Sequence, residues 1–398
     1  MITVKEALHH IRQQCHTLPP IRIPLDSACN FIAAETIYAP LDVPCFDNSA
    51  MDGYAIRYED LKNTIPLQLY YEIEAGKTEI PEVHKGEVAR IFTGAPIPIG
   101  ADTVIPQENC TVENGILNCL QTVSIGDHIR KQGTQTRKGD RVLSKGNLLT
   151  AEYIGFLATL GIDSVVVFPK PKVGIIITGK ELVPVGNTLQ NGQIYESNSV
   201  ALKVLLQQLE IPVVFSQWID DNESELFHFV SENFTKVDVL LLTGGISVGD
   251  YDFVKRILDK IGTTEIFYKI QQKPGKPLFF GKKDQTLFFG LPGNPSAVVT
   301  CFHAYIKPAL LQITGDQPQA EHDAILVTPY RKKSGLTHFV KARVQGGKAT
   351  ILDKQLSYQM DTYAQANAFV VLNEEQEDFK IGEKVRIIFF YNYKDIKL

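Results

Sequence analysis

The chain has 398 residues, enough for two to four domains of ordinary size. Apolar residues make up 44% and charged residues 21%, which is typical of a globular protein and disfavours disorder. The formal net charge of −5 excludes a strongly basic protein that binds nucleic acid or a membrane surface through its overall charge. No apolar stretch is long enough for a membrane helix and the N-terminus lacks a signal-peptide core, so we expect a cytoplasmic location.

The six cysteines form no CxxC pair anywhere in the sequence. This spacing disfavours a disulfide framework, a zinc site and a thioredoxin-like redox motif. Free cysteine is among the residue types most often found in protein interiors. We therefore predict isolated, buried thiols.

The N-terminal residues predict a helix. Thr3 and Glu6 fit a capping box, in which each side chain accepts a hydrogen bond from the other residue's backbone N–H. Apolar residues recur at helical spacing from Val4 to Cys15, and Pro19 ends the pattern. A second helical pattern covers residues 150–161 and also has its apolar residues on one face.

The stretch between these two helices has a different pattern. Short runs of alternating apolar and polar residues, separated by Gly, Pro and Asn turns, predict an all-β segment. Asn114 and Gly115 between two such runs predict a hairpin. We therefore predict a β domain, 39–139, inserted into a split helical domain that consists of residues 1–38 and 140–168.

Residues 169–316 alternate between apolar strands and amphipathic helices. The expected strands are 173–177, 212–215, 237–242 and 286–289, and the expected helices are 197–210, 222–234, 251–261 and 295–313. Continuous apolar strands that alternate with helices indicate a doubly wound parallel α/β sheet with both faces covered. From residue 317 to 398 only short strands are expected, and they indicate a small β-barrel domain.

Ligands of doubly wound sheets bind beyond the carboxyl ends of the strands. Three turns at such ends are rich in Gly and carry polar side chains. They are 178–182, with Glu181; 243–252, with Gly244, Gly245, Ser247 and Asp252; and 290–296, with Pro292, Asn294 and Ser296. Backbone N–H groups freed by glycine, a helix N-terminus and hydroxyl donors all attract an anion. Neither GxGxxG nor GxxxxGK[ST] occurs in these turns, so they are not standard nucleotide motifs.

A lysine-rich segment precedes the last of these turns. Lys269, Lys273 and Lys276 lie close together, and the run Pro-Gly-Lys-Pro fixes the loop that carries them. Such lysines attract an oxyanion. Carboxylate oxygens add hard ligands, for which Mg²⁺ is the expected ion. The candidate ligands are Glu181, Asp221 and Asp252.

Six segments together resemble the molybdopterin molybdenumtransferase family, which includes the MoeA proteins and the gephyrin E domain. They are FDNSAMDGYA (46–55), RIFTGAPIP (90–98), TGKEL (178–182), TGGISVGDYDF (243–253), KPGKP (273–277) and GLPGNPSA (290–297). The segments follow the family's order and spacing over nearly the whole chain. The resemblance implies that adenylylated molybdopterin and molybdate react to give molybdenum cofactor and AMP, with Mg²⁺. It also implies a homodimer whose active site lies between the molybdopterin-binding domain of one subunit and the β insertion of the other.

The resemblance also assigns roles to individual residues of this sequence. The implied catalytic residues are Asp52, Thr93, Glu181 and Asp252. The implied metal ligands are Glu181, Asp221 and Asp252. The implied substrate-binding residues are Gly244, Gly245, Ser247, Lys269, Lys273, Lys276, Pro292, Asn294 and Ser296.

Some of these assignments have alternatives. Asp220 is a close rival of Asp221, Asp252 is also placed to cap its helix, and Ser247 is also placed to bond the local backbone. Asp47, in the first segment, is interpreted as structural.

Two positions depart from the family pattern. Lys180 replaces an acid or a small polar residue, so one carboxylate is missing from that turn. Lys341 replaces an arginine, which keeps the charge but loses the bidentate geometry. Ser357 resembles a serine of the family's C-terminal domain, and this match is weaker than those of the six segments.

Two alternative functions remain. One is adenylylation of molybdopterin by ATP, the reaction of a sibling enzyme that lacks the flanking β segments, and the other is a scaffold role like that of the gephyrin E domain. Besides its substrates, the implied partners are a second copy of the chain, the adenylyltransferase and the molybdoenzymes that accept the product. Neither nucleic acid nor a membrane is an expected partner.

Overall fold

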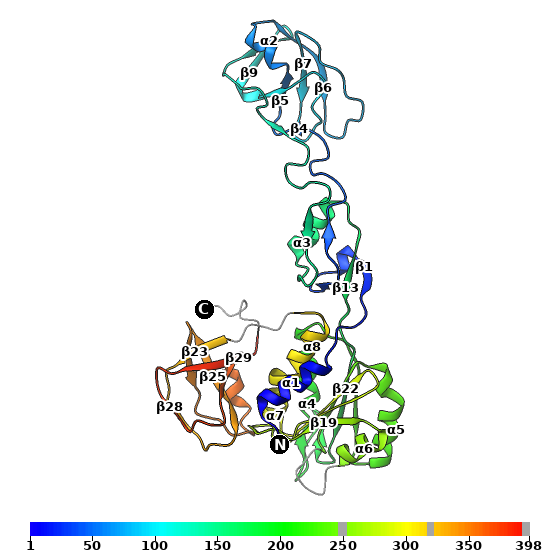
Figure 1. The fold of residues 1–398 in the computed structure, drawn as a ribbon, viewed down its shortest axis with the longest axis vertical. Coiled ribbons are helices and arrows are strands. Elements are labelled where there is room, and N and C mark those ends of the chain that lie inside the picture. Colours follow the sequence, from blue (N-terminus) through cyan, green and yellow to red (C-terminus); the bar gives the residue numbers. More distant parts are fainter. Residues whose placement is uncertain (246–252, 317–321, 392–398) are drawn as a thin grey trace. The chain divides into compact units, whose positions relative to one another are not determined.

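The computed structural model describes residues 1–245, 253–316 and 322–391 (Figure 1). Contacts within the chain divide it into two compact units. Unit 1 consists of Met1–Ile21 and Val166–Leu398, and unit 2 is the intervening stretch, Arg22–Val165. Each unit has hydrophobic core clusters of its own. The finer division into four segments stays a prediction from the sequence.

Unit 1 is built around a six-stranded sheet. Its strands are, in sheet order, β17 (Val213–Ile219), β14 (Val173–Thr178), β18 (Val239–Thr243), β22 (Thr286–Leu291), β21 (Phe279–Lys283) and β19 (Thr264–Tyr268). The first four run parallel, which confirms the predicted parallel sheet. β21 pairs antiparallel with both of its neighbours, so it alone of the six strands runs in the opposite direction, and it forms a tight hairpin with β22 in which Asp284 adopts a positive φ of 52°.

Helices cover both faces of this sheet, so the doubly wound arrangement is confirmed (Figure 1). Alternate residues of a strand point to opposite faces: Ile175 and Ile177 of β14 belong to one core cluster and Ile176 to the other. The helices on the first face are α4 (Asn198–Gln208) and α7 (Pro295–Cys301), and those on the second are α5 (Glu223–Asn233) and α6 (Phe253–Ile261).

The long helix predicted over 295–313 is interrupted. After α7 comes a π-helical turn, Phe302–Ile306, and then α8 (Lys307–Ile313). Pro308 lies at the start of α8 and has no backbone N–H to donate to the carbonyl one turn earlier. The helical segment therefore widens just before the proline. Neither this segment nor any other helix in the described ranges is long and apolar enough to cross a membrane.

The C-terminal strands close into the small barrel that the sequence predicted. They pair in the cycle β25–β26–β23–β29–β27 and back to β25. Their bounds are β23 (His322–Leu326), β25 (Thr337–Gln345), β26 (Lys348–Ile351), β27 (Ala368–Leu372) and β29 (Lys384–Phe389). A two-residue strand of the lysine-rich segment, β20 (Gln272–Lys273), pairs with β25 in parallel. The barrel therefore holds that segment through backbone hydrogen bonds, a link that the sequence did not reveal.

The N-terminal helix, α1 (Val4–Gln14), has the predicted capping box. Glu6 N–H donates to Thr3 Oγ1 (3.2 Å), and Thr3 N–H donates to Glu6 Oε2 (2.8 Å). Gln312 of α8 donates to two carbonyl groups near the end of the helix. The second predicted helix, α3 (Ala151–Thr159), lies in unit 2. The two helical stretches that the sequence grouped into one split domain thus belong to different compact units.

Unit 2 contains the predicted β segment. Its six-stranded sheet has the order β8 (Thr103–Pro106), β5 (Gly53–Ile56), β7 (Glu87–Ile91), β6 (Leu67–Ile73), β10 (Ile116–Cys119) and β9 (Cys110–Glu113). One short helix, α2 (Tyr58–Lys62), follows β5. The predicted hairpin joins β9 to β10, with Asn114 and Gly115 both at positive φ.

The remaining strands are short or lie at the boundary between the units. A three-stranded sheet has the order β1 (Ile21–Pro24), β13 (Ser164–Phe168) and β2 (Ile32–Ala33). The paired two- and three-residue strands are β3 (Ile37–Tyr38) with β12 (Arg141–Leu143), β4 (Asn48–Ser49) with β11 (Ile129–Arg130), β15 (Leu182–Val183) with β16 (Ile194–Tyr195), and β24 (Tyr330–Arg331) with β28 (Asp378–Phe379).

The prediction of isolated, buried thiols is wrong for most of the cysteines. Cys15 and Cys301 are buried, whereas the other four are exposed or half-buried. Cys29 and Cys45 lie in surface turns, where little apolar material covers them. Cys110 and Cys119 lie on the outermost hairpin of the unit 2 sheet, directly opposite each other.

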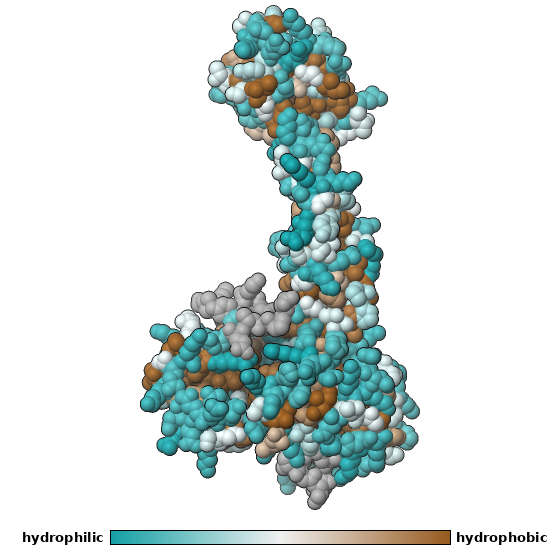
Figure 2. Space-filling model, viewed as in Figure 1, coloured by the Kyte–Doolittle hydropathy of each residue, from teal (hydrophilic) through white to brown (hydrophobic). Residues whose placement is uncertain are grey.

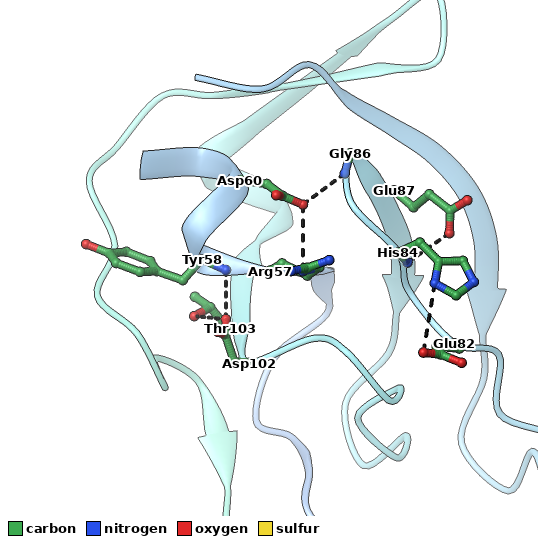
Figure 3. A network of polar contacts seen from close by, with 9 residues as sticks. All are labelled: Arg57, Tyr58, Asp60, Glu82, His84, Gly86, Glu87, Asp102 and Thr103. Carbon is green, nitrogen blue, oxygen red and sulfur yellow. Dashed lines mark hydrogen bonds and ion pairs between the residues drawn. The ribbon is translucent and has the colours of Figure 1, made fainter. Parts of the chain in front are cut away.

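A polar network in unit 2 connects α2, β7 and β8 (Figure 3). The buried carboxylate of Asp60 accepts a hydrogen bond from Gly86 N–H (2.9 Å) and lies 4.0 Å from Arg57 Nε. Asp102 Oδ1 accepts from Tyr58 N–H (2.8 Å). These bonds join segments that are distant in the sequence, so they fix the start of α2 against the sheet.

The network gives a stability prediction. Replacement of Asp60 by Ala leaves the half-buried Gly86 N–H without its acceptor, so we expect unit 2 to lose about 1–3 kcal/mol of unfolding free energy. Denaturant unfolding followed by circular dichroism measures the loss. Glu59→Ala, at an exposed position of the same helix, is the matched control and should change stability by about 0.5 kcal/mol or less. Equal effects of the two variants would contradict the role of Asp60.

Candidate active site

The carboxyl ends of the four parallel strands lie level with one another. Thr178, the last residue of β14, is the register partner of Ile219 in β17, and Ile177 is the partner of Thr243 in β18. Thr243 is in turn the partner of Leu291 in β22. Because the strand ends are level, the turns that follow them meet at one edge of the sheet. This edge, called the carboxyl edge below, therefore gathers the described parts of the three predicted turns.

The side chain of Asn198, the first residue of α4, holds two of these turns together. Its Nδ2 donates to Thr243 Oγ1 (2.9 Å) and to the carbonyl of Gly293 (2.8 Å). Thr243 Oγ1 donates in turn to the carbonyl of Pro292 (3.4 Å). Both Asn198 and Thr243 are buried. The turn after β18 and the turn after β22 are therefore fixed relative to each other by side chains, not only by the sheet.

Glycine is required at the turn after β18. Gly244 has a φ of 88°, and a Cβ added there would lie 2.1 Å from the carbonyl oxygen of Thr178. Gly293, from the turn after β22, is also close to this turn, because a Cβ added to Gly293 would lie 3.7 Å from Gly244 Cα. The backbone of the turn is thus packed between two neighbouring strand ends. No side chain fits at position 244.

Two buried polar atoms at the carboxyl edge lack hydrogen-bond partners among the described residues. They are Thr178 Oγ1 and Asn198 Oδ1, on side chains whose residues are 2% and 7% exposed. Unpaired buried polar atoms are costly in a native protein, and each calls for an explanation such as an ordered water or a bound group. A hydroxyl can donate or accept and an amide oxygen accepts, so a group that carries both donors and acceptors would complete this pair.

The predicted acidic residues lie at the same edge. Glu181 follows β14 and Asp221 follows β17, and both are exposed. Trp218 Nε1 donates to the carbonyl of Gly179 (3.3 Å), which ties the two turns together. Asp252 and Ser247 lie outside the described residues.

Within the described ranges, no group of three or more His, Cys, Asp or Glu side chains could hold a metal ion. Mg²⁺ usually binds through one or two carboxylates together with substrate phosphates. The exposed carboxylates of Glu181 and Asp221 fit such a substrate-bridged ion, and they do not form an all-protein site.

The lysine-rich loop is held by a buried amide. Gln272 Nε2 donates to the carbonyls of Pro274 and Gly275, each at 3.0 Å. A Cβ at Gly275 would lie 2.8 Å from Cys301 Sγ, so the loop packs closely on α7. The loop exposes the side chains of Lys273 and Lys276. Both ammonium groups are therefore presented from a rigid backbone.

Lys269 differs from the other two lysines. It is half-buried, and its Nζ lies 4.8 Å from the ring centroid of Tyr268. The cation–π contact orients the ammonium group along the loop.

The last turn connects the carboxyl edge to the barrel. Asn294 caps α7, because its Oδ1 accepts from Ser296 N–H (3.2 Å), and its Nδ2 donates to Ser357 Oγ (3.3 Å). Ser296 is 2% exposed, and its hydroxyl lies 3.0 Å from that of Tyr363. The structure thus places Ser296 in a packed contact. The sequence analysis missed Tyr363, since it is far from every motif in the sequence.

Two residues of the barrel strand β25 have pKa values that are lowered by burial. Burial, followed by the charges of Lys332 and Lys273, lowers the pKa of His338 to about 4, so this histidine is neutral at pH 7. Burial also lowers the pKa of Lys341, whose Nζ donates to the carbonyl of Gln359 (2.8 Å). Lys341 therefore holds the segment that carries Ser357 and does not point to solvent. A single ammonium group is enough for this contact, so the bidentate geometry of an arginine is not needed at this position.

In unit 2, the predicted residues Asp52 and Thr93 are in direct contact. Asp52 Oδ1 accepts hydrogen bonds from Thr93 N–H (2.8 Å) and Thr93 Oγ1 (2.7 Å). These two bonds, with a smaller contribution from the charge of Arg90, lower the pKa of the Asp52 carboxyl. The carboxylate is half-exposed and ionised at neutral pH, so it is available to an external partner.

Two further residues, which the sequence analysis did not select, support this pair. Gln107 N–H donates to the carbonyl of Asp52 (3.0 Å). Arg90 donates to the carbonyl of Gly53 (3.1 Å) and lies over the ring of Tyr54, 4.9 Å from its centroid. Asp47, interpreted as structural, pairs with Lys131 (2.8 Å).

Comparisons with known proteins agree with this geometry. Three family models match the chain: the MoeA N-terminal region (domain I and II) over residues 2–161, a probable molybdopterin binding domain over 174–312, and the MoeA C-terminal region (domain IV) over 323–390. A molybdopterin molybdenumtransferase of Haemophilus influenzae is 37% identical over 91% of this chain and 92% of its own length. The chain belongs to the molybdopterin molybdenumtransferase family.

Other members of the family are similar over the full length. A molybdopterin molybdenumtransferase of Staphylococcus aureus is 34% identical over 97% of this chain and 95% of its own. The crystal structure of a MoeA molybdopterin biosynthesis protein from Pyrococcus horikoshii superimposes with a TM-score of 0.86 and 30% identity, over 99% of this chain and 100% of that one. Membership makes this protein a transferase of molybdenum cofactor biosynthesis, as its motifs predicted.

The close approach at Gly244 gives a prediction with a matched control. Gly186 also has a positive φ, 97°, but a Cβ there would meet no described atom within 4 Å. Gly186→Ala should therefore cost about 1 kcal/mol from the backbone alone. Gly244→Ala should cost about 1–3 kcal/mol more, because the methyl group must displace the end of β14. Denaturant unfolding of both variants measures the difference, and equal losses would contradict the contact.

The bonds from Thr93 give a pH prediction. They hold the pKa of Asp52 below its ordinary value of 3.8, so they stabilise unit 2 at higher pH and are lost as the pH falls through the lowered pKa. Thr93→Val removes one of the two bonds, and the pKa of Asp52 should rise toward 3.8. Carboxyl ¹³C shifts followed by NMR from pH 5 to pH 2 (roughly the range of carboxyl titration) measure the change. Thr111→Val, at an exposed position of β9, should leave the titration of Asp52 unchanged.

Proposed function

We propose that this transferase inserts molybdate into adenylylated molybdopterin and releases AMP, with Mg²⁺ as the required ion. The observation that carries the proposal is the carboxyl edge, where a glycine turn packed against Thr178 leaves two buried polar atoms without partners among the described residues. An amphoteric heterocycle is the ligand that such a pair of atoms would recognise. Family membership supports molybdopterin as the heterocycle.

The residues of the chain suit the anionic parts of these substrates. Molybdate is a tetrahedral dianion, and Lys273 and Lys276 present ammonium groups from a loop fixed by Gln272. α7 connects this loop to the carboxyl edge, because it begins at Asn294 and packs on Gly275 at Cys301. A substrate that extends from the edge toward the loop would therefore bring its reacting end close to the lysines.

The acidic residues suit the phosphoanhydride. Glu181 and Asp221 would hold Mg²⁺ together with the substrate phosphates. When bound, the ion neutralises charge on the phosphates and polarises the bond that breaks as AMP leaves. Asp52, ionised and half-exposed in unit 2, is proposed to reach the site from a second subunit.

The direct test is AMP release. Purified protein with adenylylated molybdopterin, molybdate and Mg²⁺ should form AMP and a cofactor that activates an apo-molybdoenzyme. Protein given molybdopterin and ATP alone should form no adenylylated product. Absence of AMP in the first assay, or robust adenylylation in the second, would overturn the proposal.

The second subunit is proposed from an apolar surface of unit 1. Val200 and Val204 project one turn apart from the outer face of α4 and are 50% and 49% exposed, and Ile194 of neighbouring β16 is 54% exposed. Figure 2 shows one face of the molecule, on which apolar residues (brown) lie among polar ones (teal). Exposed valines one turn apart on a helix, like those of α4, are typical of a subunit interface, and we propose a second copy of this chain as the occupant.

The remaining partners and the location follow from the same proposal. A biosynthetic enzyme of this kind works in the cytoplasm, receives its substrate from the adenylyltransferase and passes its product to molybdoenzymes. Neither nucleic acid nor a membrane takes part.

The lysine loop gives a prediction about molybdate. Lys276→Ala removes a charged donor, so the molybdate concentration for half-maximal AMP release should rise about tenfold to a hundredfold, with little change in binding of adenylylated molybdopterin. Lys348→Ala, at an exposed position of the barrel strand β26, is the matched control and should behave like the wild type. Unchanged molybdate dependence of Lys276→Ala would contradict the assignment.

The shared site gives a prediction about mixed dimers. Asp52→Ala and Glu181→Ala chains should each be inactive alone and regain about one quarter of the wild-type activity when mixed at random, because half of the dimers are mixed and each has one intact site. Size-exclusion chromatography with light scattering checks that the variants still form dimers. No recovery in verified mixed dimers would exclude a site shared between subunits.

A further inference from the structure

Two cysteines of unit 2 lie opposite each other on neighbouring strands. Cys110 begins β9 and Cys119 ends β10, and the two are register partners in the antiparallel hairpin. Nothing in the proposed reaction uses them. They are separated by eight residues in the sequence, so their pairing depends entirely on the hairpin turn at Asn114 and Gly115.

The hydrogen-bond pattern of the hairpin fixes the kind of pair they form. Leu120 N–H donates to the carbonyl of Asn109 (2.8 Å), one position beyond the cysteines. Hydrogen-bonded and non-hydrogen-bonded pairs alternate along an antiparallel ladder, so Cys110 and Cys119 form a non-hydrogen-bonded pair. The Cα atoms of such a pair lie about 4.5 Å apart, within the range of roughly 4.4–6.8 Å that disulfides span. The backbone need not move far for the two sulfurs to bond.

The surroundings make Cys119 the more reactive of the two thiols. Both are half-buried, so small oxidants reach them. They share a hydrogen bond, which lowers the pKa of Cys119 and raises that of Cys110, and the charge of Arg90 acts on Cys110 in the opposite direction. Thiolate is the reactive form of cysteine. Cys15 and Cys301 differ from Cys119 in both respects, because they are buried and burial raises the pKa of each to about 12.

We propose that Cys110 and Cys119 are a redox modification site, at which a peroxide oxidises the two thiols to a disulfide across the hairpin. The sulfur of Cys119 attacks the O–O bond, takes one oxygen as a sulfenic acid and releases the other as water or an alcohol. The sulfur of Cys110 then attacks the sulfenic sulfur, the S–S bond forms, and the sulfenic oxygen leaves as water. Two thiols and one hydrogen peroxide thus give one disulfide and two waters.

The position of the pair ties the modification to the Asp52 segment. Gln107, whose N–H holds the carbonyl of Asp52, lies just before Cys110, and Arg90 contacts Gln107 Oε1. The disulfide would fix the start of β9 next to these contacts. This site does not depend on the proposed function, since its chemistry involves only the two cysteines and the oxidant.

The test is peptide mapping of the full chain after mild treatment with hydrogen peroxide. We expect a peptide in which Cys110 is linked to Cys119, lighter than the reduced pair by two hydrogen atoms and restored by dithiothreitol. Cys15 and Cys301 should stay reduced. If both Cys110 and Cys119 remain fully alkylatable while exposed Cys29 is oxidised, the proposal is wrong.

A variant distinguishes the order of the two steps. In Cys110→Ser, the sulfenic acid of Cys119 lacks its resolving thiol, so a dimedone adduct should accumulate at Cys119. Cys29→Ser is the matched control, because Cys29 is exposed in a turn, and it should form the Cys110–Cys119 disulfide like the wild type. Wild-type mapping decides the proposal even if Cys110→Ser does not fold. Disulfide between other cysteines in place of this pair would overturn it.

Discussion

The level ends of four parallel strands are the constraint on which the site of unit 1 depends. Parallel pairing puts the carboxyl end of every strand at the same edge, and the observed register brings Ile177, Thr243 and Leu291 to one line. Turns far apart in the sequence therefore meet without any need for direct attraction between them. The amide of Asn198 then fixes two of the turns against each other. The packing of Gly244 against Thr178 holds the turn after β18 against the end of β14.

The sequence was sufficient for the parts of the fold that have a local signal. Continuous apolar runs such as 173–177 predicted the strands, and Pro295 after Asn294 predicted the start of α7. The π-helical turn was not predicted, because a proline in the interior of a long helix, such as Pro308, is also compatible with a simple kink. The division of the chain into two compact units was not predicted, since no local pattern says which core a helix covers.

The candidate site divides in the same way. Motif residues such as Asp52, Thr93 and Gly244 were found because they lie in dense polar or glycine-rich runs. Asn198 and Tyr363 were not, since each stands alone in the sequence and matters through one long-range contact. The net charge of −5 illustrates the same limit, because the lysines that suit an anion are gathered by the loop around Gln272 while the sum over the chain hides them.

The pairing of β20 with β25 means that the α/β segment and the barrel are not separable modules. β20 belongs to the α/β segment by sequence, yet its neighbour in a sheet is a strand of the barrel. Removal of the barrel would leave β20 unpaired where the lysines emerge, and transfer of the barrel to another protein would leave the start of β25 without β20. The lysine-rich loop and the barrel strand that pairs with it are one cooperative element, although they lie more than 60 residues apart in the sequence.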